Sequence, residues 1–148
     1  AFPSGIGAIP IEVTENQCPL YFKRKEYLTD SAGAGEWRGG LSQTIEIANR
    51  EKAPFTISAA TFDRIKYPAK GRDGGGPGVK GVARLGSGKA IPDKGIHVIP
   101  TGDSLVVELP GGGGFGDARK RSRALVEADV KSGVVSLEAA ERDYSLDS

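Results

Sequence analysis

Clusters of glycine limit what this chain can fold into more than any other feature of its sequence. The 148 residues include 22 glycines and 9 prolines, and six of the twelve residues at 70–81 are glycine. A second cluster, PGGGGFG, occupies 110–116. Glycine adopts turn conformations and lets backbones approach closely, but it adds no side chain to a core. Because hydrophobic residues make up only 38% of the chain, we expect a modest core and part of the stability to come from a partner surface.

The segments between the glycine clusters are typical of short strands. Residues 41–48 alternate between apolar and polar types, which predicts a half-buried strand. Another strand is expected within 18–28, starting after Pro19, and the β-forming residues at 55–62 are expected to form a hairpin with 41–48. Further expected elements are an alternating stretch opening at 11–13, strands at 82–85, 95–99 and 104–109, and a tight turn at 101–103.

Helical signals appear only near the end of the chain. Asp117 is a suitable N-cap for a helix through about Lys131, and Ser132-Gly133 would end it. Ser136 can cap a second helix that reaches Tyr144. The sequence therefore predicts a mainly β, α+β fold: short, mostly antiparallel strands with glycine-rich loops in a region 1–116, and a helical tail at 117–148.

Charge and cysteine content restrict the function classes. Twenty basic and nineteen acidic residues give a net charge of +1, which argues against binding to nucleic acid or to a membrane surface. No apolar run approaches the ~20 residues of a membrane span, and the N-terminal residues lack a signal-peptide pattern. The single Cys18 excludes an internal disulfide framework and a cysteine-rich zinc site, so we expect a cytoplasmic protein.

Two residues that often do chemistry are better explained structurally here. His97 is the only histidine and lies in an expected strand between Ile96 and Val98. A single histidine cannot build the usual metal site without ligands from another chain, so a strand-face position is the favoured interpretation. Cys18 has no flanking cation nearer than Lys23 and no Cys-x-x-Cys pattern, and we interpret it as a packing residue. The chain thus offers no catalytic and no metal-binding constellation.

The glycine clusters themselves have two interpretations. Successive backbone amides in glycine-rich loops can form a nest for an anion, and Lys70, Arg72 and Lys80 flank the first cluster. Neither cluster has the lysine-containing phosphate-loop pattern. Close backbone packing is therefore favoured, and contact with a ligand or a partner is the alternative. The candidate contact residues are Gly75, Gly76, Gly78, Gly112, Gly113 and Gly114.

The loop DSAGAGEWRGG also allows two interpretations. Asp30 and Arg38 can pin the ends of this loop together through an ion pair, which is the favoured interpretation. Alternatively, Trp37 and Arg38 meet a neighbouring protein chain, because Trp and Arg are frequent anchors of protein interfaces.

Four segments, in order, resemble the closing region of the hydantoinase B/oxoprolinase family. They are AFPSGIGAIPIEVTE at 1–15, DSAGAGEWRGGL at 30–41, GGGPG at 74–78 followed by IPDKG at 91–95, and PGGGGFGD at 110–117 followed by the helical tail. The resemblance covers nearly the whole chain. Two departures are Ala32, where the family usually has glycine, and Ala118, where it often has proline.

The resemblance implies the function of a larger assembly. It places metal and substrate chemistry in an upstream, hydantoinase B-like catalytic body and implies a hydantoinase A-like subunit that handles ATP, so the expected partners form a hetero-oligomer. ATP and a divalent metal are implied for the whole complex, and this chain is expected to bind no cofactor. The implied reactions are ATP-dependent opening of cyclic amides such as hydantoins and oxoproline, or carboxylation of ketones.

Three roles remain open from the sequence. We favour a non-catalytic part of such a complex that supports the catalytic body and subunit assembly. The alternative is a free-standing β-rich module that binds a small anionic ligand in its glycine loops. A third, an autonomous enzyme, lacks a catalytic constellation to support it.

Overall fold

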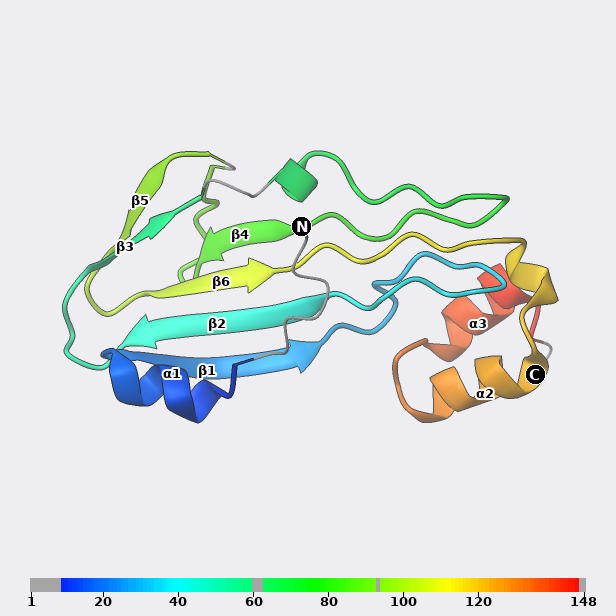
Figure 1. Ribbon diagram of the computed structural model, residues 1–148, viewed down its shortest axis with the longest axis horizontal. Coiled ribbons are helices and arrows are strands. Elements are labelled where there is room, and N and C mark those ends of the chain that lie inside the picture. The colour runs from blue at the N-terminus through cyan, green and yellow to red at the C-terminus, as the bar shows by residue number, and fades with distance from the viewer. Residues whose placement is uncertain (1–8, 60–62, 93, 147–148) are drawn as a thin grey trace.

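A computed structural model of the chain describes residues 9–59, 63–92 and 94–146. A β-sheet occupies one end of the elongated molecule, long glycine-rich segments run from it, and two helices cover the other end (Figure 1). The helices are α1 (Ile11–Gln17), α2 (Arg123–Lys131) and α3 (Leu137–Tyr144), with 3-10 turns η1 (Asp63–Ile65) and η2 (Ala118–Lys120). The strands are β1 (Leu20–Tyr27), β2 (Gln43–Asn49), β3 (Phe55–Ser58), β4 (Val82–Leu85), β5 (Ile96–Ile99) and β6 (Ser104–Glu108).

The main sheet is antiparallel and has the order β1-β2-β6-β4. The remaining strands, β3 and β5, pair as an antiparallel two-stranded sheet. Antiparallel sheets of short strands followed by two helices confirm the predicted α+β class.

The predicted hairpin between 41–48 and 55–62 is wrong in its pairing. Strand β2 lies between β1 and β6, and β3 pairs with β5 instead. Alternation of residue types determines which residues form a strand and which face they use, but it carries no information about the partner strand. Of the expected second strand, 55–58 form β3 and Ala59 lies beyond its end, whereas 60–62 lie outside the described residues.

One of two hydrophobic cores lies where the small sheet meets the main one. Its buried members come from β4, β5, β6 and the segment after β4, and Phe55, Ile57, Ile65 and Val107 pack against them. The buried members are Ala83, Leu85, Ile91, Ile99 and Leu105. On the opposite face of the main sheet, Thr44 and Val106 are also fully buried.

Residues 11–13, expected to open an alternating stretch, belong to helix α1. Three residues are too few to separate a period of two from a period of 3.6. Pro10 precedes the helix and Glu12 lies in its first turn, positions that suit a helix start. The Glu15 carboxylate accepts a hydrogen bond from the Phe22 backbone at 2.7 Å, which fixes α1 against β1.

The helical tail follows the prediction with one break. Asp117 caps the 3-10 turn η2 by accepting a hydrogen bond from the Arg119 amide. Arg121 then takes extended backbone angles and Ser122 has a ψ of 128°, neither of them helical, so α2 begins only at Arg123. The stop at 132–133 and the Ser136 cap of α3 are confirmed: Gly133 has a φ of 73° and the Ser136 hydroxyl accepts from the Ala139 amide.

Candidate site: the glycine bundle and its carboxylate clamp

Three glycine-rich segments, 31–40, 69–79 and 111–116, pack side by side and are called the glycine bundle here. They extend together from the sheet toward the helical tail (Figure 1). Main-chain hydrogen bonds join all three segments: Gly76 N donates to Ala34 O at 2.7 Å, and Gly114 N donates to Gly76 O at 2.9 Å. Gly112 both receives and gives a bond, from Gly33 N and to Gly40 O, each at 2.8 Å.

Glycine is required in the bundle because the neighbouring backbones leave no room for a side chain. A Cβ built on Gly114 would lie 2.0 Å from the Ala34 carbonyl oxygen, and one on Gly111 would lie 1.8 Å from Ser31 O. Real Cβ atoms essentially never approach other atoms this closely. Gly40, in contrast, has nothing within 4 Å of its Cβ position.

All six candidate contact glycines lie in this bundle. The amides of five of them donate to protein carbonyls, namely those of Gly75, Gly76, Gly78, Gly112 and Gly114. An anion nest needs amides that point to an open site, and these five amides are already engaged by the protein's own carbonyls. A role of these glycines as partner contacts stays a prediction.

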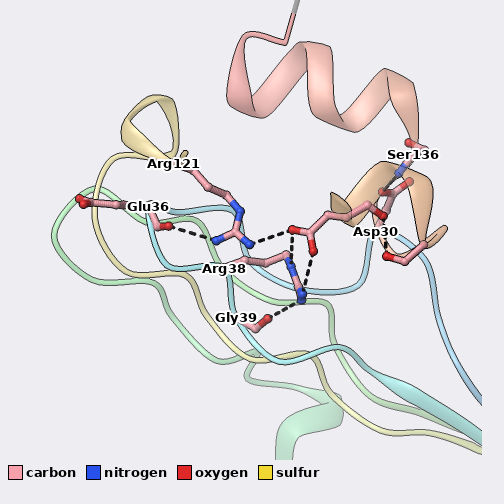
Figure 2. A network of polar contacts seen from close by, with 8 residues as sticks. Asp30, Glu36, Arg38, Gly39, Arg121 and Ser136 are labelled. Carbon is pink, nitrogen blue, oxygen red and sulfur yellow. Dashed lines mark hydrogen bonds and ion pairs between the residues drawn. The ribbon is translucent and has the colours of Figure 1, made fainter. Parts of the chain in front are cut away.

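One carboxylate joins the helical tail to the bundle. Asp129 of α2 receives two hydrogen bonds from Arg38, at 3.0 Å from Nε and 3.2 Å from Nη2. It also receives one from Arg121 Nη2 at 2.9 Å. The two guanidinium groups reach back to main-chain oxygens of Gly39 and Glu36 (Figure 2). We call Asp129, Arg38 and Arg121 the carboxylate clamp.

The expected Asp30–Arg38 ion pair is therefore not formed. Arg38 pairs with Asp129, and Asp30 instead accepts a hydrogen bond from the Ser136 amide at 2.7 Å (Figure 2). Asp30 does hold an unusual backbone angle, with a φ of 57°. Both residues tie the loop to the tail rather than its ends to each other.

Sequence reasoning missed Asp129 and Arg121. Asp129 lies in a helix rich in charges, and such charges usually face solvent. Both groups are largely covered here, with side-chain exposures of 13% for Asp129 and 8% for Arg121. No local pattern marks either residue, because their contacts span 8 and 91 positions.

Trp37 is not part of the clamp, although it neighbours Arg38. It is 62% exposed and forms an isolated antiparallel bridge with Phe115. The structure therefore separates the two residues that the sequence proposed as a joint interface pair: Arg38 faces the tail and Trp37 faces solvent.

The remaining chemistry candidates lie far from the bundle. His97 is in β5, where its Nε2 lies 3.1 Å from the Lys94 carbonyl oxygen. The Cys18 thiol donates to Thr14 O at 3.3 Å at the end of α1. Over residues 9–59, 63–92 and 94–146, no three His, Cys, Asp or Glu side chains gather closely enough to hold a metal ion. In the same ranges no helix is long and apolar enough to cross a membrane.

The pKa values of Glu46 and Tyr144 depart from their ordinary values for clear physical reasons. The Ser104 hydroxyl donates to Glu46 at 2.7 Å and, with Lys23 nearby, lowers the pKa of that carboxyl. Burial in the core of the tail raises the pKa of the Tyr144 phenol. Glu46 lies in β2 of the main sheet and Tyr144 in the core of the tail, so both shifts follow from local hydrogen bonding and packing.

Comparison with known proteins identifies the family. The family model described as hydantoinase B/oxoprolinase matches residues 1–118. The chain belongs to the hydantoinase B/oxoprolinase family. Among its relatives, the beta subunit of the caprolactamase of Pseudomonas jessenii is 30% identical over 145 residues, and a putative D-/L-hydantoinase B subunit of a Pseudomonas species is 28% identical over 144 residues. An uncharacterised protein of Methanocaldococcus jannaschii is 35% identical over 140 residues.

Solved structures share the fold of this family member. The ATP-dependent caprolactamase from Pseudomonas jessenii matches 93% of the chain with a TM-score of 0.75 and 28% identity. A nucleotide-free acetone carboxylase matches 93% of it with a TM-score of 0.67 and 20% identity, a likeness of fold. The three relatives are matched over 92–93% of this chain but only 24% of their own length, so the chain spans about a quarter of them.

Proposed function

We propose that this chain is the C-terminal region of a hydantoinase B-like subunit in an ATP-dependent enzyme complex. Its role there is structural: it supports the catalytic body and the assembly of subunits. The similar proteins support the setting, since they include the beta subunit of a caprolactamase, a hydantoinase B subunit and the structure of an ATP-dependent caprolactamase. A hydantoinase A-like subunit that handles ATP is the proposed partner, in a cytoplasmic hetero-oligomer.

The observation that carries this role is how the glycine bundle uses its functional groups. Five candidate amides bond to protein carbonyls, and the arginines and carboxylate of the clamp bond to one another. These groups bind other groups of the protein and hold the backbone in position, so they are not available to bind a substrate. The proposed chemistry, opening of a cyclic amide or carboxylation of a ketone, is therefore assigned to the upstream body and the ATP-handling partner, along with ATP and a divalent metal.

The test compares the chain alone with the complete complex. The 148-residue chain and the assembled enzyme are each given ATP, Mg²⁺ and a cyclic amide such as caprolactam, a hydantoin or oxoproline, or acetone with bicarbonate. We expect turnover from the complex and none from the chain alone. We also expect the complex to lose assembly and activity with Gly114→Ala and to keep both with Gly40→Ala.

Two results would contradict the proposal. Ring opening or carboxylation by the isolated chain would assign the catalytic groups to these residues. A complex that assembles and turns over normally without this chain would remove its structural role.

A further inference from the structure

An exposed strip of aromatic and cationic side chains crosses the glycine bundle. Phe115 lies between Trp37 and Arg72, joined to each by a β-bridge. The Trp37 and Phe115 backbones exchange both hydrogen bonds at 2.9 Å, and Gly116 N donates to Arg72 O at 3.0 Å. Residues directly opposite in such bridges project from the same face, so the three side chains form a row.

The row continues onto the neighbouring part of the bundle. Arg72 also lines an open cleft with Tyr67 and Lys70. Exposure is high along the whole surface: 70% for Tyr67, 62% for Trp37 and 48% for Phe115. We call Tyr67, Lys70, Arg72, Phe115 and Trp37 the aromatic–cationic strip.

The cations of the strip, Lys70 and Arg72, differ from the clamp arginines in their side-chain partners. Arg38 and Arg121 are held by Asp129, whereas the side chains of Lys70 and Arg72 form no hydrogen bond or ion pair with any described residue. The segment 64–80 carries five cations and a single carboxylate, Asp73. In a chain with a net charge of only +1, this is a local concentration of positive charge.

The bundle also makes this surface suitable for binding. Backbone hydrogen bonds on both sides hold the bridged residues in place, so little conformational entropy is lost when a partner docks. Tryptophan, tyrosine and arginine are the residues that most often dominate the free energy of protein interfaces. Unpaired cations among them favour a partner surface that carries carboxylates.

We propose that the aromatic–cationic strip is the docking surface for a separate subunit of the enzyme, which meets it with an acidic surface containing apolar side chains. This inference rests on the proposed function, because it identifies where the assembly contact is made. A long polyanion such as nucleic acid is disfavoured as the partner, since the overall charge of +1 provides no extended positive field.

Trp37 allows the contact to be followed directly, because it is the only tryptophan. The chain is labelled with 5-fluorotryptophan, and the companion subunit is left unlabelled. We expect the ¹⁹F resonance to shift when the companion subunit is added and to lose its sensitivity to exchange of H₂O for D₂O. Affinity is measured in parallel as a function of salt for wild type, Trp37→Ser and Arg72→Glu.

The exposed cation Lys89, in the turn after β4 at the far end of the sheet, supplies the matched control Lys89→Glu. Trp37→Ser and Arg72→Glu should each raise the Kd for the companion subunit by about 30-fold or more. Lys89→Glu should change it by less than about threefold, as expected for a charge outside the interface. Circular dichroism checks that each variant stays folded.

The outcomes separate this inference from the proposed function. If no companion subunit associates with the wild-type chain, the proposed function fails. If the complex forms while Trp37 remains exposed to solvent, or if Lys89→Glu weakens binding as much as Arg72→Glu, the docking surface is wrong and the proposed function stands. A ¹⁹F response to ATP or to an oligonucleotide, without one to the companion subunit, would also overturn the docking surface.

Discussion

Replacing Gly114 by alanine should destabilise the chain severely, because its neighbours are backbone atoms that cannot move aside cheaply. The new Cβ would lie 2.0 Å from Ala34 O, and an ordinary contact needs at least 3.4 Å, so the two segments must separate by about 1.4 Å. This movement disrupts the Gly114 N–Gly76 O and Gly76 N–Ala34 O hydrogen bonds. Gly40→Ala is the matched control, since nothing lies within 4 Å of its Cβ position.

The size of the effect follows from two contributions. Overpacking a close contact costs about 1–3 kcal/mol, and each of two disrupted hydrogen bonds costs about 1 kcal/mol. The free energy of unfolding should therefore fall by about 3–5 kcal/mol for Gly114→Ala, out of a total on the order of 5–15 kcal/mol. For Gly40→Ala it should stay unchanged or rise by up to about 1 kcal/mol, because alanine restricts the unfolded chain.

Urea denaturation of the 148-residue chain, followed by circular dichroism and by Trp37 fluorescence, measures both values. Thermal unfolding should show a loss of roughly 10–15 °C for Gly114→Ala. Equal stabilities for the two alanine variants, with a loss below about 1 kcal/mol in each, would refute the reasoning that backbone packing requires these glycines.

Further predictions concern the tail and the sheet. Asp129→Asn should lower the unfolding free energy by about 2–4 kcal/mol in urea denaturation, because it leaves two largely covered arginines without a counter-charge; Glu127→Gln, in an exposed ion pair, should cost less than about 1 kcal/mol. Ser104→Ala should raise the pKa of Glu46 toward its ordinary value, measured by NMR titration of the carboxylate, and should reduce the stability that Glu46 contributes above its ordinary pKa and loses as pH falls through its folded pKa. Because the folded pKa of Tyr144 is raised, the unfolded chain releases the phenol proton at lower pH than the folded chain does. The unfolding free energy should therefore decline as pH rises above the ordinary tyrosine pKa. Tyr144→Phe should remove this part of the decline, as measured by denaturation of both proteins at each pH.

Local features of the fold were predictable from the sequence. The Ser136 cap and the stop at Gly133 depend on residues within a few positions of each other, and both are confirmed. The strand that begins after Pro19 is confirmed for the same reason. Signals of this kind act within one helix or strand, so they can be recognised without knowing which other element that helix or strand packs against.

Features that depend on distant partners were not predictable. The pairing of β2 with β6 joins Thr44 to Glu108, and the clamp joins Arg38 to Asp129. Nothing near either residue indicates its partner. The glycines combine a predictable and an unpredictable feature. Their grouping predicted close backbone packing, but the backbone segment that each glycine contacts is known only from the structure, where three distant segments meet.

The glycine bundle also explains how a chain of low hydrophobic content can stay organised. Its two cores lie at opposite ends: one beneath the sheet, and one in the tail around Val126 and Tyr144, where Ala34 of the bundle packs. Between them the bundle buries backbone rather than side chains, so hydrogen bonds, not apolar area, couple the ends. Loss of the clamp should therefore release the tail while the sheet core remains intact, and hydrogen exchange of Asp129→Asn should show faster exchange in α2 and α3 than in β2 and β6. Uniform loss of protection across all four elements would show instead that bundle and tail unfold only together with the sheet.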